Sequence, residues 1–132
     1  MGKNPVAHFE IYADDPDALA TFYTSLFDWK IEPVPGMDYR MIATADRASG
    51  EGTTQSAGIN GGMLKRPTGY DPRAWVNYVT VDSLDQSAAK AVKLGAKQTK
   101  GRAAVPGMGW FAMFVDPQGN NFALWQADTN AK

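Results

Sequence analysis

The chain has 132 residues, a length typical of one domain that can bury a core without disulfides. Its formal net charge is −1, and its 13 lysine and arginine residues are scattered, so nothing indicates a nucleic-acid or membrane partner. The absence of cysteine excludes disulfides, thiolate chemistry and cysteine-ligated zinc. The sequence shows neither an apolar leader nor an apolar run long enough to cross a membrane, and we expect a cytoplasmic protein.

Residues 5–12 alternate in the manner of a strand with two different faces. Phe9 and Ile11 fall on one face. The other face carries His8, Glu10 and Tyr12. We therefore expect one face of this strand to enter the core and the other to line a functional surface.

A helix is predicted directly after this strand. Asp15 can cap its first turn, and Pro16 suits the first helical position. Apolar residues then recur at helical spacing and form one stripe, namely Leu19, Phe22, Tyr23, Leu26 and Phe27.

Three shorter extended runs complete the first half of the chain, at about residues 29–33, 38–45 and 55–60. A polar, glycine-rich loop at 46–54 separates the last two and is predicted to be a mobile lid. We place the first module at about residues 1–66 and a linker at about 67–72.

The second half, about residues 73–132, repeats this order. A strand at 74–81 precedes a helix at about 83–94, which begins with a capping-box pattern at Ser83. Strands follow at about 97–103, 109–115 and 121–126, and the segment 116–120 has strong turn chemistry between the last two.

A short motif supports the duplication. Val34-Pro35-Gly36-Met37 returns as Val105-Pro106-Gly107-Met108, and an aromatic residue follows each copy. The sequence therefore predicts a single α+β domain over residues 1–132, built from two tandem βαβββ modules that form a half-open barrel around a cleft.

Several motifs together resemble the vicinal oxygen chelate superfamily, which includes glyoxalase I, bleomycin-resistance proteins and extradiol dioxygenases. The motifs are His8 in the first strand, the helix that ends near Phe22-Tyr23, the turn at 116–120 and the closing strand at 122–126. The segment 109–117 is similar to a glyoxalase-like subgroup. The resemblance covers nearly the whole chain.

The resemblance implies a divalent metal held by histidine and glutamate side chains, which acts as a Lewis acid on a substrate with neighbouring oxygens. His8 matches the ligand of the first strand. Val76 and Ala123 stand at two further ligand positions and cannot bind a metal. Glu10 and Glu51 are carboxylates that could rebuild a site, although their spacing does not argue for it.

His8 therefore has two interpretations. It is either a hydrogen-bonded wall residue, or a metal ligand or acid/base group, for which an imidazole that titrates near neutrality is suited. Glu10 is likewise either a carboxylate at the rim of the cleft or part of the site.

Aromatic residues give a second indication of function. By alternation and resemblance, five of them are predicted to face the concave side: Tyr12, Tyr39, Tyr78, Trp110 and Trp125. The core facing the helices is predicted to contain Phe9, Ile11, Val79, Val81, Phe111, Met113, Phe122 and Leu124. The concave rings would either bind aromatic or cationic small molecules, or simply fill the concavity or a dimer interface.

Two functions follow from these observations. The first is a metal-free protein that binds an apolar or aromatic small molecule through His8, Glu10 and the five concave aromatic residues, with no cofactor. The second is a divalent-metal lyase or dioxygenase with His8 as a metal ligand. Exposed sheet edges favour a homodimer in either case.

Overall fold

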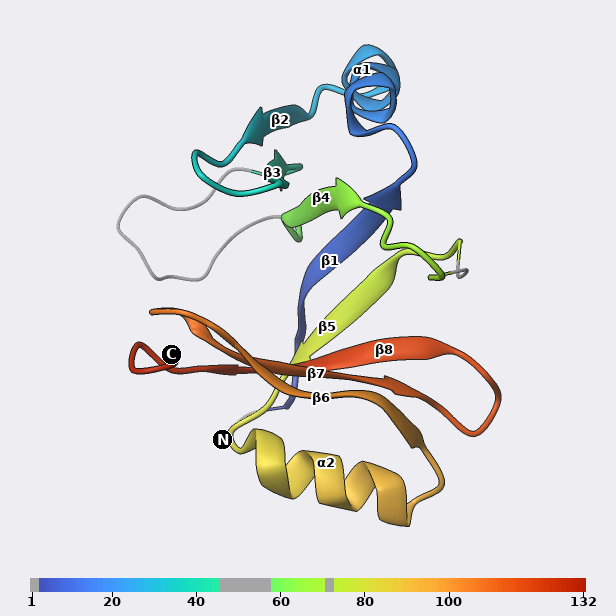
Figure 1. Cartoon of the computed structure of the whole chain (residues 1–132), viewed down its shortest axis with the longest axis vertical. Coiled ribbons are helices and arrows are strands. Elements are labelled where there is room, and N and C mark those ends of the chain that lie inside the picture. The colour runs from blue at the N-terminus through green and yellow to red at the C-terminus, as the bar shows by residue number, and fades with distance from the viewer. Residues whose placement is uncertain (1–2, 46–57, 71–72) are drawn as a thin grey trace. The chain divides into compact units, whose positions relative to one another are not determined.

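The computed structural model describes residues 3–45, 58–70 and 73–132. These residues form two compact units. The first unit is His8–Trp75, and the second is Val76–Lys132 together with the N-terminal segment up to Ala7. Within the described residues, each unit contributes one helix and four strands, and the strands belong to an eight-stranded sheet (Figure 1). Neither of these helices has the length and apolar character that a membrane span requires.

The first unit contains the first copy of the repeat. Its elements are β1 (Val6–Ala13), α1 (Pro16–Leu26), β2 (Lys30–Pro33), β3 (Tyr39–Ala43) and β4 (Gly61–Lys65). The strands follow the order β2-β3-β4-β1. The β2–β3 and β3–β4 pairs are antiparallel, whereas β1 and β4 are parallel.

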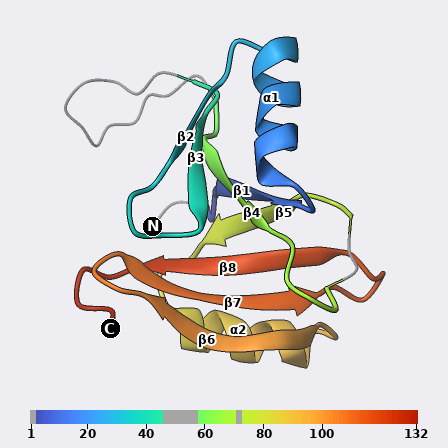
Figure 2. The ribbon, with the colours of Figure 1, turned by 45° about the horizontal axis from the view of Figure 1, so that its top comes forward.

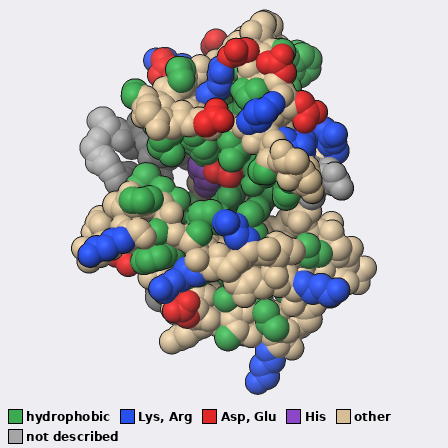
Figure 3. Space-filling model, in the orientation of Figure 1, with side chains coloured by type: hydrophobic (Ala, Val, Ile, Leu, Met, Phe, Trp, Pro, Cys, Tyr) green, Lys and Arg blue, Asp and Glu red, His purple; other side chains and the backbone are tan. Residues whose placement is uncertain are grey.

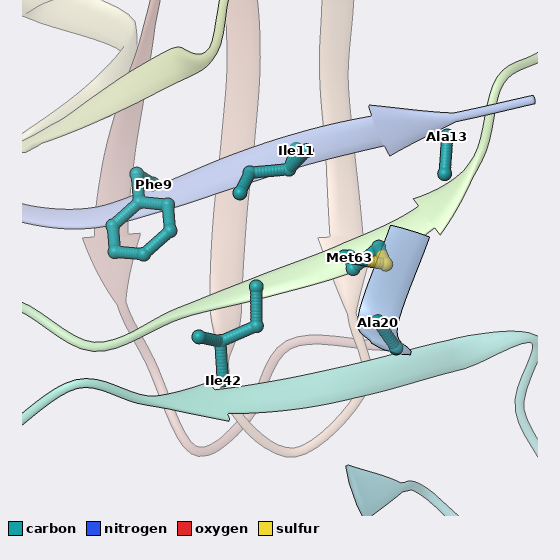
Figure 4. Packing of buried hydrophobic residues seen from close by; sticks show 6 residues of the cluster. All are labelled: Phe9, Ile11, Ala13, Ala20, Ile42 and Met63. Carbon is teal, nitrogen blue, oxygen red and sulfur yellow. The ribbon is translucent and has the colours of Figure 1, made fainter. Parts of the chain in front are cut away.

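The core of the first unit lies between its sheet and α1. Buried side chains from three strands and the helix converge there, namely Phe9, Ile11, Ala13, Ala20, Ile42 and Met63 (Figure 4). Tyr23 and Trp29 pack against this core, and the ring of Trp75 stacks on Phe9 at a centroid distance of 5.4 Å. The prediction that Phe9 and Ile11 are core residues is confirmed.

The second unit repeats the arrangement. Its elements are β5 (Val76–Thr80), α2 (Leu84–Lys93), β6 (Lys97–Val105), β7 (Gly109–Val115) and β8 (Asn121–Ala127). The strand order is β6-β7-β8-β5, and α2 lies along one face of the sheet (Figure 2). The backbone nitrogen of Thr80 donates a hydrogen bond of 2.9 Å to the carbonyl oxygen of Pro5, which attaches the N-terminal segment to this unit.

Corresponding strands occupy corresponding places in both units, so the α+β fold of two tandem βαβββ modules is confirmed. The repeated motif forms the same turn twice. Gly36 has φ +78° and Gly107 has φ +76°, and the turns close with hydrogen bonds from Met37 to Val34 and from Met108 to Val105. Proline before a glycine of positive φ is the signature of a type II turn, which explains why the motif recurs.

The predicted helix starts are also confirmed. Asp15 accepts a hydrogen bond from the backbone of Ala18, and Pro16 occupies the first turn of α1. Ser83 accepts the equivalent bond from Gln86 at the start of α2. Each cap satisfies a backbone N–H that has no partner within its helix.

One predicted strand is wrong. The last strand of the first module spans Gly61–Lys65, whereas the sequence placed it at about 55–60. Residues 58–60 are not in a strand, and residues 55–57 lie outside the described residues, as do the predicted lid at 46–54 and Glu51. The error arose because two glycines open this strand and leave no alternating apolar pattern to detect.

Candidate functional site

The candidate site lies on the face of the first unit's sheet that points away from α1. Alternation along the strands directs one set of side chains into the α1 core and the other set to this opposite face. We call the second set the site face. It comprises His8, Glu10 and Tyr12 of β1, Tyr39 and Met41 of β3, and Gly62 and Leu64 of β4.

Three polar side chains meet on the site face. The hydroxyl oxygen of Tyr39 lies 2.9 Å from Oε2 of Glu10 and 3.0 Å from Nε2 of His8. Nε2 of His8 lies 3.4 Å from the same carboxylate oxygen. Because Tyr39 is about thirty residues from the other two in sequence, β3 must be folded against β4 and β1 before this triad exists.

The donors and acceptors of the triad suggest one arrangement of its protons. A tyrosine hydroxyl has one proton, and an ionised carboxylate can only accept, so Tyr39 donates to Glu10. The hydroxyl oxygen of Tyr39 can then accept a hydrogen bond from Nε2 of His8 in the tautomer that carries the ring proton on this nitrogen. In this arrangement the lone pair of the imidazole is on Nδ1.

A pair of adjacent glycines makes this geometry sterically possible. A Cβ atom on Gly62 would overlap the ring and hydroxyl of Tyr39, so the phenol lies directly over the bare backbone of β4. A Cβ atom on Gly61 would overlap the ring of Phe9 on the core face. The two glycines therefore create room on opposite faces of the same strand.

Burial and one negative charge define the electrostatics of the site. The side chain of Glu10 is 14% exposed and that of His8 is 33% exposed. Burial raises the pKa of Tyr39 and of Tyr12 far above the ordinary value, and the charge of Glu10 raises both further. Both phenols therefore stay protonated at neutral pH, where they can serve as hydrogen-bond donors.

Tyr70 joins the site from the segment that follows β4. Its ring lies 4.6 Å from that of Tyr12, measured between centroids. Burial raises the pKa of Tyr70, the nearby Arg66 counteracts part of this rise, and Glu10 adds to it. The hydroxyl oxygen of Tyr70 is buried, and it has no hydrogen-bond partner in the part of the chain that the structure describes.

The space-filling view shows how this surface looks from outside. The chain has one histidine, and its purple surface is visible beside a red acidic surface and among green hydrophobic side chains (Figure 3). Met41 is half exposed and adds an apolar element to the site face. The surface thus combines polar groups capable of hydrogen bonding with apolar walls.

Two of the predicted site residues lie on one face of the second unit's sheet. Tyr78 and Trp125 pack with Val76 and Ala123 on the face away from α2. Phe111 and Met113 also lie there, so their predicted place in the helix-side core is wrong. The remaining core predictions for this unit are confirmed for Val79, Val81, Phe122 and Leu124.

The prediction that Trp110 lies on the same face as Tyr78 is wrong. It packs on the α2 side with the buried core of this unit. Its Nε1 donates a hydrogen bond of 2.9 Å to Asp128, and the guanidinium group of Arg102 lies 4.3 Å from its ring centroid. This hydrogen bond lowers the pKa of Asp128 below the ordinary value. Every residue of β7 between 110 and 115 except Ala112 is bulky and apolar, so alternation alone could not assign the two faces.

Comparison with protein families shows to which family the chain belongs. The family described as the glyoxalase-like domain matches residues 8–125. The chain belongs to this glyoxalase-like family of the vicinal oxygen chelate superfamily.

Individual relatives support this assignment. The glyoxalase-like chain is 30% identical over 118 residues to the "Putative glyoxylase CFP32" of Mycobacterium bovis, covering 87% of this chain and 41% of that protein. It is 28% identical over 139 residues to the "Anthracycline biosynthesis protein DnrV" of Streptomyces peucetius, covering 91% and 46%. The chain thus spans less than half the length of these relatives.

A solved structure shows the same fold. It is a glyoxalase/bleomycin resistance protein/dioxygenase superfamily member from Vibrio splendidus, with a TM-score of 0.62 and 10% identity. The match covers 94% of the glyoxalase-like chain and 99% of the other. At this identity the likeness concerns the fold alone.

The donor set of this glyoxalase-like protein does not fit a metal held by several histidine and glutamate ligands. Among the described residues, no group of three or more histidine, cysteine, aspartate or glutamate side chains is placed to hold an ion. His8 and Glu10 form a pair, and a catalytic divalent metal needs further ligands. The positions that the resemblance assigned to two more ligands are Val76 and Ala123, both fully buried and apolar.

Proposed function

We propose that this protein binds an apolar or aromatic small molecule on the site face without a resident metal. The observation that carries this proposal is the position of the Tyr39 hydroxyl. It contacts Nε2 of His8 and Oε2 of Glu10, the two atoms that a metal ion would need. Family membership supplies the fold, and the choice between binding and catalysis rests on this triad.

The triad opposes metal binding for a chemical reason. A metal ion requires the lone pair of an imidazole nitrogen, and in the tautomer that donates from Nε2 of His8 to Tyr39 this nitrogen has no lone pair to offer. The carboxylate oxygen Oε2 of Glu10 already accepts the proton of the same hydroxyl. An ion bound by Nε2 of His8 would require this nitrogen to lose the proton that it donates to Tyr39.

The same surface suits a flat apolar ligand. Tyrosine rings offer apolar faces with polar tips, and the half-exposed Met41 offers an adaptable side chain next to them. One relative is named for the biosynthesis of anthracyclines. An aromatic ligand would agree with that name. We retain Tyr78 and Trp125 as further candidates for ligand contact because both lie away from α2 on their own sheet.

Metal content tests the proposal directly. Protein purified without chelators should contain far less than one Ni, Zn, Fe or Mn per chain by elemental analysis, and added ions should leave its melting temperature unchanged. The control is His8→Ala, which should behave like the wild type in both measurements. One tightly held ion per chain that is lost in His8→Ala would overturn the proposal.

A second candidate function is a divalent-metal lyase or dioxygenase. One observation favours it: His8 and Glu10 lie 3.4 Å apart on neighbouring positions of one strand face, as two ligands of one ion could. It requires an activity that chelators abolish and that added metal restores. An activity that survives complete chelation would exclude this candidate.

A further inference from the structure

We propose that Met41 is a site of oxidation by peroxide, and that its sulfoxide weakens the binding of apolar ligands on the site face. The thioether sulfur takes one oxygen atom from hydrogen peroxide: the O–O bond breaks, an S–O bond forms and water is released. The sulfur loses two electrons and the peroxide gains them. The effect on ligand binding rests on the proposed function, whereas the oxidation itself does not.

The first argument is the exposure of Met41. This residue is 50% exposed on β3, whereas Met63 of the neighbouring strand β4 is fully buried in the α1 core. Strand alternation explains the contrast, because Met41 belongs to the site face and Met63 to the opposite face. Peroxide in solution can therefore reach Met41 in the folded protein, whereas it reaches Met63 only when the core opens.

The second argument is the supply of oxidisable sulfur. The sequence contains six methionines and no cysteine, so a thioether is the only sulfur group that it offers to a peroxide. Met37 and Met108 are also exposed, and each follows the glycine of a proline-glycine turn. Neither of these two belongs to the site face. Met41 is therefore the exposed methionine at which oxidation would alter the ligand surface.

The third argument is the place of Met41 on the site face. It pairs with Gly62 of β4, and Gly62 pairs with Glu10 of β1, so these three residues form one row across the sheet. Gly62 has no side chain, and the ring of Tyr39 lies over its backbone. The side chain of Met41 therefore forms an apolar wall in the same row as the phenol of Tyr39.

A sulfoxide would make this wall polar. Its oxygen is a hydrogen-bond acceptor that water satisfies while the surface is free. An apolar ligand that covers Met41 would remove this water without offering a donor, which costs binding free energy. The ionised carboxylate of Glu10 in the same row is itself an acceptor and has no proton to offer the new oxygen. We expect the affinity for neutral aromatic compounds to fall about tenfold.

Mass spectrometry tests the modification. The folded protein is treated with hydrogen peroxide at pH 7, and the sulfoxide at each methionine is followed over time. Met41 should be oxidised about tenfold faster than Met63, and the two rates should become equal in protein unfolded by urea. A rate at Met41 no higher than that at Met63 in the folded protein would overturn the proposal.

Three neutral aromatic probes test the consequence: 1-naphthol, indole and 2-phenylethanol. Their dissociation constants are measured by equilibrium dialysis before peroxide treatment and again after the peroxide is removed. Met41→Leu cannot form a sulfoxide, so treatment should leave the affinity of this variant unchanged. Met108→Leu is the matched control, because it removes an exposed methionine of the second unit, and peroxide should still weaken its binding about tenfold.

The outcomes separate the two proposals. Unchanged affinity of the wild type after oxidation of Met41 would overturn the regulation and leave the binding function standing. An equal loss of affinity in Met41→Leu would also overturn it, because the effect would then come from another residue. If the untreated protein binds none of the three probes, the binding function is contradicted together with its regulation, and the oxidation of Met41 is still decided by mass spectrometry.

Discussion

Gly62 lies directly beneath the ring of Tyr39, at a distance that leaves no space for a side chain. This contact joins β4 to β3 on the site face and allows the hydroxyl of Tyr39 to reach two residues of β1. A residue with no functional group of its own thus determines the position of the polar triad.

Replacing this glycine should dismantle the triad. In Gly62→Ala the new methyl group would overlap the phenol, so Tyr39 would turn away and lose its hydrogen bonds to His8 and Glu10. We expect a loss of about 1–3 kcal/mol in the free energy of unfolding, measured by denaturant titration. Gly101→Ala is the control, because a Cβ there meets nothing within 4 Å, and it should leave stability nearly unchanged. Equal stability of the two variants would contradict the packing described for Gly62.

Two tyrosine hydroxyls should differ sharply in their contribution to stability. Tyr39→Phe removes one hydrogen-bond partner of His8 and one of Glu10 and should cost about 1–3 kcal/mol. Tyr70→Phe removes a buried hydroxyl with no partner among the described residues and should be neutral or stabilising by up to about 1 kcal/mol. Urea unfolding of both variants at pH 7 measures the difference, and a larger loss in Tyr70→Phe would refute it.

Alkaline pH should destabilise the fold through the buried phenols. Burial, and secondarily the charge of Glu10, raises the pKa of Tyr12 above its value of 10.0 in a free side chain. Above about pH 10 the unfolded chain therefore loses this proton first, and stability falls as pH rises. Tyr12→Phe should fall less steeply with pH than the wild type in unfolding experiments between pH 9 and about 11. Parallel curves would show that Tyr12 ionises normally in the folded state.

Acid should act through a different residue. Hydrogen bonds from Arg66, and then from Arg73, hold the pKa of Asp14 below its ordinary value. The stabilisation is therefore present above about pH 4 and is lost as pH falls through the lowered pKa. Asp14→Asn should be less stable than the wild type at pH 7, and the difference should shrink towards pH 2. Because the ion pairs are exposed, 1 M salt should also reduce it, and a salt-independent difference would point to another cause.

Trp110 should behave as a structural residue of the second unit. Its ring packs on the α2 core and its nitrogen bonds to Asp128, so Trp110→Ala should cost about 3 kcal/mol of stability. Binding of a small aromatic compound to the site face of the folded variant should be unchanged. A variant that keeps its stability and loses this binding would restore the ligand-contacting role that the sequence suggested.

Local signals in the sequence predicted most of the fold. The caps at Asp15 and Ser83 and the two proline-glycine turns depend on neighbouring residues only, and all four were located correctly. Strand β4 was misplaced because Gly61 and Gly62 are dictated by Phe9 and Tyr39, which lie far away in the chain. A glycine required by a distant ring looks the same in sequence as a glycine in a loop.

The candidate site shows the same division. Strand alternation correctly grouped His8, Glu10 and Tyr12 on one face, since that pattern needs only one strand. The contact of Tyr39 with this group depends on the register of β3 against β4, which no short motif encodes. Tyr70 was missed because it lies in a segment assigned to the linker, where no periodicity marks a buried ring.

Strand β1 passes from one unit to the other, because residues up to Ala7 belong to the second unit and those from His8 onward to the first. The duplicated halves therefore cannot be separated by a single cut in the connecting segment. A fragment that starts at Val76 would lack the carbonyl group of Pro5 that accepts a hydrogen bond from Thr80. The complementary fragment, which ends at Trp75, would begin with an N-terminal segment that belongs to the other unit. Dissection of this protein into autonomous halves requires a circular permutation that carries the first seven residues along with the C-terminal half.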